Sequence, residues 1–154
     1  MKQIILIASS LLLINNANAQ DLKETEVPEM IKQSFLKIYP NTKVDGWEKE
    51  GTNYEAEFHL NNAESSAIFD ANGRFKELEQ EIKITELPIA ATEYCAKTYV
   101  GYKLEEAVKI TDVSGKILFE AELKKGKEHF DVMFDDKGNA IKKGDVETKK
   151  EAKD

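Results

Sequence analysis

Four glutamates in two matched pairs, Glu55/Glu57 and Glu120/Glu122, have the residue type and spacing for acid–base chemistry. Alternate strand residues lie roughly 7 Å apart on one face of a sheet, and glycoside hydrolases use two carboxylates at a comparable separation. General acid catalysis also needs an apolar pocket that raises the pKa of one carboxyl group. These pairs alternate with apolar residues, as on the water-facing side of a strand. We therefore expect solvated glutamates and no catalytic residue.

The chain has two histidines, His59 and His129, and one cysteine, Cys95. His59 and Glu57 could share a metal ion on one strand face, but two ligands make a weak site. We expect both histidines to be solvated at the surface. Cys95 matches Phe35 on an apolar helical face, so we interpret it as a small buried hydrophobic residue and not as a nucleophile.

Two short acidic stretches, Asp70–Gly73 and Asp135–Gly138, superficially resemble calcium-binding loops. Neither has the alternating oxygen ligands and the distal glutamate of a full loop. We interpret both as hairpin turns, in which Asp caps backbone N–H groups and Gly supplies a positive φ. The sequence also has no serine–histidine–aspartate order, phosphate-binding glycine loop or dinucleotide motif. It therefore predicts a protein that is not an enzyme and that binds no metal or cofactor.

The first 19 residues have the three parts of a secretory signal peptide. Lys2 gives a positive start, Ile4–Ile14 is apolar, and Ala17–Ala19 supplies small residues for cleavage. The apolar run is too short to span a bilayer. Cleavage would leave 135 residues of 154, and the loss of Lys2 would change the formal net charge from −7 to −8. We expect export to the periplasm or beyond, no later membrane span, and an acidic surface that does not favour nucleic acid.

The chain is internally duplicated. Thr25–Pro28 recurs as Thr85–Pro88, sixty residues later, and Tyr54–Phe58 recurs as Phe119–Leu123, sixty-five residues later. One five-residue insertion reconciles the two offsets, and the matches keep their order along the chain. A duplicated unit explains this pattern better than chance does.

Each repeat predicts a helix followed by an antiparallel meander. The helical positions are Val27, Ile31, Phe35 and Ile38 in the first repeat and Leu87, Ala91, Cys95 and Thr98 in the second. After each helix the apolar period falls to two, and short turns containing glycine favour antiparallel neighbours. We predict an α+β fold in which tandem helix-plus-four-stranded antiparallel meander repeats form one extended sheet, with the helices packed on one face.

These elements divide the chain into a signal peptide, one domain and a tail. The signal peptide covers residues 1–19, the domain covers 20–146, and the charged tail covers 147–154. Within the domain, repeat one spans about 25–84 and repeat two about 85–145.

The first repeat has, in order, a helix ending at Tyr39-Pro40, then Trp47, the strand Tyr54–Phe58 and the turn Phe69–Gly73. Taken together, these motifs resemble the PepSY-like family, which is also described as β-lactamase-inhibitor-like. The second repeat departs from the pattern, with Tyr99-Val100 in place of Tyr-Pro. The resemblance covers nearly the whole mature chain. It implies an α+β fold, export, and an architecture that includes inhibitors which bind a partner enzyme on the exposed face of the sheet.

Three apolar residues are candidates for partner binding. Alternation places Ile68 and Met133, which are equivalent in the two repeats, on the sheet face opposite the helices. Exposed apolar side chains ringed by Glu and Asp are typical of an interface core and rim. Trp47 is a third candidate because aromatic side chains anchor interfaces, although it could also belong to the core.

Two classes of function remain open. The first is an exported, non-catalytic protein-binding module whose unknown protein partner binds the open face of the sheet. One form of such a module is an inhibitor of a secreted or periplasmic enzyme. The alternative is a small-ligand carrier, which would use space left by the small residues Ala91, Cys95 and Thr98 under the second helix, or a structural protein of the envelope.

Overall fold

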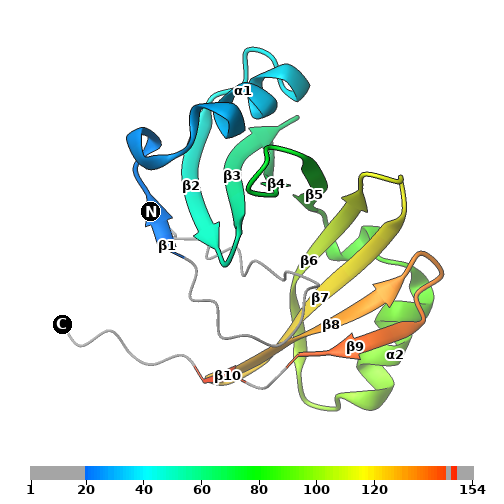
Figure 1. Ribbon diagram of the computed structural model, residues 1–154. Helices are drawn as coiled ribbons and strands as arrows, with labels where there is room; N and C mark the ends of the chain where they lie inside the picture. Colours follow the sequence, from blue (N-terminus) through cyan, green and yellow to red (C-terminus); the bar gives the residue numbers. More distant parts are fainter. Residues whose placement is uncertain (1–19, 145–146, 149–154) are drawn as a thin grey trace.

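The computed structural model describes residues 20–144 and 147–148, and the predicted signal peptide lies outside them. Figure 1 shows the helices packed beside a large twisted sheet. The helices are α1 (Glu29–Ile38) and α2 (Ile89–Thr98). The strands are β1 (Gln20–Leu22), β2 (Val44–Glu50), β3 (Asn53–Leu60), β4 (Ala63–Phe69), β5 (Phe75–Glu81), β6 (Lys103–Asp112), β7 (Ile117–Lys125), β8 (Glu128–Asp135), β9 (Ala140–Lys143) and β10 (Glu147–Thr148). Within the described residues, no helix has the length and apolar character needed to cross a membrane.

All described strand pairs are antiparallel, and strands β1 to β8 follow one another in the order of the chain. The first repeat contributes α1 and β2–β5, and the second contributes α2 and β6–β9, with β5 and β6 joining the two halves. The predicted α+β fold with tandem helix-plus-four-stranded repeats is therefore confirmed. Glu147 and Thr148, which we expected in a charged tail, instead form β10 beside β8.

Both helices begin in the same way because the sequence before them is the same. Lys23 and Lys83 donate their backbone N–H groups to Glu26 and Glu86, at 2.8 Å and 2.9 Å. These carboxylates close a short 3₁₀ turn before each helix. Such a reciprocal cap satisfies backbone groups that would otherwise lack partners. The glutamate of the repeated Thr-Glu-x-Pro motif thus acts as a structural cap.

The helices bury the predicted positions except at their last turns. Ile31 and Phe35 of α1 and Ala91 and Cys95 of α2 are buried. Ile38 is 43% exposed, and Thr98 is also exposed, so these two assignments were wrong. The following tyrosine, which is Tyr39 or Tyr99, packs against the core in their place. The backbone leaves helical geometry at each tyrosine, and this change of direction turns the aromatic ring inward.

The first core is organised around Phe35. Its ring packs against Trp47, Phe58 and Phe69 in edge-on contacts with centroid distances of 6.0, 5.0 and 6.5 Å. Aromatic pairs prefer this arrangement because a positive ring edge meets a negative ring face. Trp47 is 6% exposed in this cluster, so it belongs to the core below α1.

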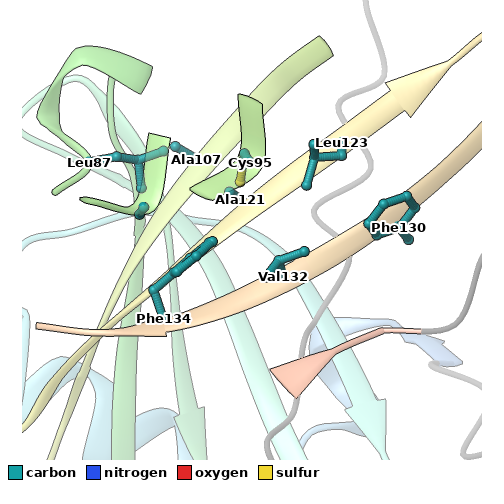
Figure 2. Packing of buried hydrophobic residues seen from close by; sticks show 9 residues of the cluster. Leu87, Cys95, Ala107, Ala121, Leu123, Phe130, Val132 and Phe134 are labelled. Atoms are coloured by element: carbon teal, nitrogen blue, oxygen red, sulfur yellow. The ribbon is translucent and has the colours of Figure 1, made fainter. Parts of the chain in front are cut away.

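In the second core, the helix α2 packs smaller side chains against the sheet than α1 does in the first. Cys95 is 1% exposed and lies in one buried cluster with Ala107 and Ala121 (Figure 2). Desolvation raises the pKa of its thiol to about 11, which keeps the sulfur protonated and unreactive, as predicted. Larger strand residues, Phe130 and Phe134, fill the remaining volume. The cluster occupies the space that a small-ligand carrier would have needed under α2.

The Asp-x-x-Gly turns attach the sheet to the helices. Asp70 accepts backbone hydrogen bonds from Asn72 and Arg74, and Asp135 does the same within its own turn. Gly73 and Gly138 adopt φ values of +73° and +85°. Both stretches are therefore turns, as predicted.

Gly138 has a second constraint, because a Cβ atom there would lie 2.7 Å from the backbone nitrogen of Ala91 in α2. We expect Gly138→Ala to lower the free energy of unfolding by about 2–4 kcal/mol, through a left-handed backbone and a steric clash. Gly115 is the matched control, since its φ is +84° and nothing lies within 4 Å of its Cβ position. Gly115→Ala should lower the free energy of unfolding by only about 1–2 kcal/mol. Urea denaturation measures both variants, and equal losses would show that the contact with α2 is unimportant.

Candidate functional site

The sheet face turned away from both helices, here called the helix-free face, carries alternate residues of β2–β8. Strand pairing places these residues in transverse rows. One row runs Glu48, Glu55, Ile68, Glu77 and Asp112. The next runs Glu57, Ser66, Glu79, Ile110, Leu118 and Asp135. A third runs Glu81, Val108, Glu120 and Met133. The face thus combines an apolar middle with many carboxylates.

Ile68 and Met133 lie on the predicted face, but they are not exposed. Their side chains are 5% and 4% accessible, and Met133 packs with Ile110 and Leu118. The prediction of exposed apolar side chains was wrong at this point. Alternation determines the face on which a side chain lies, whereas its exposure also depends on sheet twist and on the length of neighbouring side chains. Trp47 lies on the other face.

Like charges stand directly opposite one another across this face. Glu48 pairs in register with Glu55, and Glu77 pairs with Asp112. In the second repeat, Glu122 lies between Glu106 and Asp131. Like charges at directly opposite positions destabilise a sheet. The folded chain therefore accepts a cost on this face that a stability-optimised surface would avoid.

Several glutamates of this face have raised pKa values, mainly because they are buried. Burial is the largest cause of the shift to a pKa of about 7 at Glu55, with a smaller contribution from the charge of Glu48. Burial also raises the pKa of Glu79 well above its ordinary value, and the charges of Glu55 and Glu120 add to the effect. Glu57 and Glu77 shift upward for the same main reason.

The expectation of solvated glutamates was therefore wrong for Glu55, Glu120 and Glu122, which are 3%, 5% and 8% exposed. A raised pKa meets one requirement of a general acid. Burial is the largest cause of the raised pKa values of Glu48, Glu55, Glu57, Glu77 and Glu79, and nearby acidic charges add to each of them. Asp112, which faces Glu77, has a lowered pKa instead, because Ser114 and the backbone of Lys116 donate hydrogen bonds to it within the turn. The turn explains this lowered value, and the shifts alone assign no catalytic pair.

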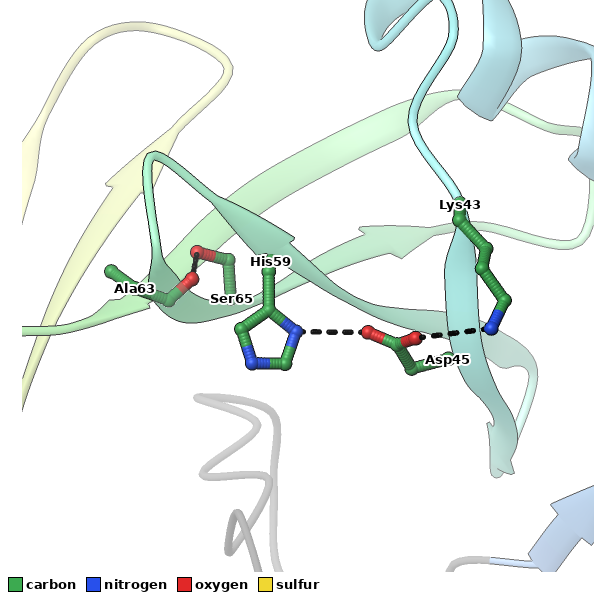
Figure 3. Close-up of polar contacts among 5 residues, drawn as sticks. All are labelled: Lys43, Asp45, His59, Ala63 and Ser65. Atoms are coloured by element: carbon green, nitrogen blue, oxygen red, sulfur yellow. Dashed lines mark hydrogen bonds and ion pairs between the residues drawn. The ribbon is translucent and has the colours of Figure 1, made fainter.

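The two histidines differ in their surroundings. His59 is solvated, as predicted, and its Nδ1 lies 2.9 Å from Oδ2 of Asp45, while Lys43 approaches the other carboxylate oxygen (Figure 3). His129 is 4% exposed, so the prediction of a surface histidine was wrong there. It is the second residue of β8, and this strand lies between β7 and β10. Among the described residues, no group of three His, Cys, Asp or Glu side chains could hold a metal ion.

Two cavities lie away from the helix-free face or at its margin. One, of about 440 Å³, opens at the ends of β6 and β7 and is lined by charged residues that include Lys103, Glu105 and Lys124. Lys124 forms an ion pair with Glu105 at 2.7 Å, so its charge is already matched. The other, of about 250 Å³, lies beside α1 near Leu36 and Trp47. Neither is the apolar pocket under α2 that the carrier hypothesis requires.

Comparison with known proteins gives one family and a consistent fold. The profile of the family described as "Putative beta-lactamase-inhibitor-like, PepSY-like" matches residues 13–65 and 53–142. No curated protein matches the chain.

Three crystal structures have similar folds at low sequence identity. A BLIP-like protein from Bacteroides fragilis is 24% identical, with a TM-score of 0.64 over 82% of this chain and 91% of that one. A DUF2874 family protein from Bacteroides uniformis is 17% identical, with a TM-score of 0.68 over 76% and 88%. A protein from Bacteroides eggerthii, named as one of the "putative periplasmic proteins", is 15% identical, with a TM-score of 0.68 over 76% and 87%.

The raised pKa of Glu55 predicts how stability changes with pH. A carboxyl group whose pKa is higher in the folded chain stabilises the fold at low pH, and this contribution is lost as pH rises through the folded-state value. We expect the free energy of unfolding to fall between about pH 4.5 and pH 7, by at most roughly 3 kcal/mol for this one group. Urea denaturation across this range measures the effect.

Glu55→Gln should flatten this pH dependence and make the protein more stable than the wild type above pH 7. Glu93→Gln on the exposed side of α2 is the control and should leave the curve unchanged. A Glu55→Gln curve parallel to that of the wild type would show that this carboxyl group is not the one that titrates.

Proposed function

Since the chain belongs to the PepSY-like family described as putative β-lactamase-inhibitor-like, we propose that it is a non-catalytic protein-binding module that acts in the periplasm. Its partner binds the helix-free face of the sheet and is an enzyme of the cell envelope, which the bound chain inhibits. The predicted signal peptide and the periplasmic and BLIP-like names of its structural neighbours support this proposal.

The observation that carries the proposal is the row of like-charged carboxylates facing one another around an apolar middle. The two larger cores lie on the helix side, and the small cluster of Ile110, Leu118 and Met133 is buried on this face. None of these clusters needs like charges at facing positions, so the repulsion is best explained by a role outside the fold. Carboxylates around apolar residues also resemble the rim and centre of an interface.

Ile68 and Met133 remain part of this proposal in a changed role. Both are too buried to be contacted first, but they form the floor of the helix-free face below the carboxylates. We propose that the partner reaches them when neighbouring glutamate side chains move aside. We assign Trp47 to the core and give it no part in binding.

Site-specific photo-cross-linking tests which face binds. A benzoylphenylalanine at position 57, which is half-buried on β3, should cross-link the mature chain to one protein of defined mass in periplasmic extract. The same group at position 93, on the exposed side of α2, should give no such product. The two variants must have the same unfolding temperature. Cross-linking from position 93 alone would assign binding to the helix side and refute the proposal.

The inhibitory part is tested on the captured protein. Titration with the mature chain should abolish the enzymatic activity of the purified partner at a molar ratio near one to one. Partner that is already cross-linked through position 57 should be inactive. Full activity of the partner in the saturated complex would show that the chain binds the enzyme without inhibiting it.

A further inference from the structure

Glu79 has the most unusual environment of the carboxylates on the helix-free face. It lies in β5, the strand that joins the two halves of the sheet, between Ser66 of β4 and Ile110 of β6. Its side chain is 2% exposed, and no hydrogen-bond donor in the described part of the chain reaches its Oε1 atom. A buried carboxylate oxygen without a donor is costly, so this atom is placed to receive a donor from outside.

The chain keeps many of its own cations away from this face. Alternation places several strand lysines on the helix side, where their ammonium groups lie over aromatic rings. Lys49 lies 5.6 Å from the ring centre of Tyr54, and Lys143 lies 4.3 Å from that of Phe130. Lys125 lies similarly over Tyr102. Lys124 and Lys142 do lie on the helix-free face, toward β8 and β9. Negative charge is therefore concentrated on the part of this face formed by β2–β5, and the lysines bound to aromatic rings do not neutralise it.

We propose that the partner presents a surface rich in arginine and lysine to the helix-free face, and that one of its cationic side chains pairs with Glu79. This inference rests on the proposed function and names the chemistry of its partner. A guanidinium or ammonium group supplies the missing donor and a positive charge together. It would also relieve the repulsion between Glu79 and its neighbours Glu55, Glu120 and Glu77.

The spacing of the carboxylates favours side-chain cations over a metal ion. Neighbours on this face are separated by roughly 5 Å across strands and roughly 7 Å along them. Within the described residues these side chains form no cluster of three that could bind one ion. A row of charges at strand spacing matches several cationic side chains of an opposing protein surface, each near its own carboxylate.

A deca-arginine peptide with a fluorescent label serves as the probe, because the partner is not yet identified. We expect the mature chain to bind it, and we expect the triple variant Glu77→Gln/Glu79→Gln/Glu81→Gln to weaken binding about tenfold or more. Fluorescence anisotropy at low and moderate salt measures the dissociation constants, and salt should weaken binding to the wild type more than to the variant. Neutralisation removes repulsion, so this variant should remain folded, which thermal unfolding verifies.

The matched control is Glu24→Gln/Glu93→Gln/Asp136→Asn, which removes the same number of charges from exposed positions away from this face. It should change the dissociation constant less than about twofold. Equal losses in the two triple variants would show a response to net charge alone and would overturn the inference. A calorimetric titration with calcium chloride should show no binding, and calcium binding that Glu79→Gln abolishes would also overturn it by revealing a metal site.

The cross-linking experiment separates this inference from the proposed function. If position 57 still cross-links the same protein in the Glu77/Glu79/Glu81 variant with an unchanged yield, the face binds a partner without charge pairing. The proposed function then stands and the cationic partner is refuted. If no protein is cross-linked from this face in either background, the proposed function itself fails.

Discussion

The structure depends on the period-two alternation of a sheet whose two halves share their faces. Because β5 pairs with β6, the helix side of the first repeat continues into the helix side of the second. The two larger cores therefore occupy one face, and alternate residues lie on the other, where Ile110, Leu118 and Met133 form a smaller buried cluster. The repeats place glutamate at many of these alternate positions. Duplication then aligns carboxylates across neighbouring strands, and the crowding on the helix-free face follows directly from the topology that builds the cores.

The two repeats reach the same architecture with different side chains. In the first, α1 supplies a large residue, Phe35, which packs against Trp47 and Phe58 of the sheet. In the second, α2 supplies Ala91 and Cys95, Ala107 takes the place of Trp47, and Phe130 takes the place of Ser65. Cores tolerate such substitutions when the apolar pattern is kept. The glycine turns are retained in both repeats because each brings a strand connection against its helix.

The sequence was sufficient to predict the elements, the duplication and the face of each strand residue, because these follow from local periodicity. Exposure was harder to predict. Ile68, Met133 and Glu55 were expected in water and are buried, and His129 lies between paired strands. Their accessibility depends on twist and on neighbours distant in the sequence, and no local pattern records these. The predicted burial of Ile38 and Thr98 was wrong for a related reason, because the backbone leaves helical geometry just after them.

The separation of charge across the sheet links the fold to the proposed binding. Lysines over aromatic rings stabilise the helix side, whereas acidic residues of opposite strands repel one another on the helix-free face. Exchanging lysines and acidic residues between the two faces at a few positions would create cross-strand ion pairs and would leave the cores unchanged. The arrangement therefore has a cost that folding alone does not explain. A partner of opposite charge would recover that cost on binding, and its affinity would come partly from repulsion already present in the free chain.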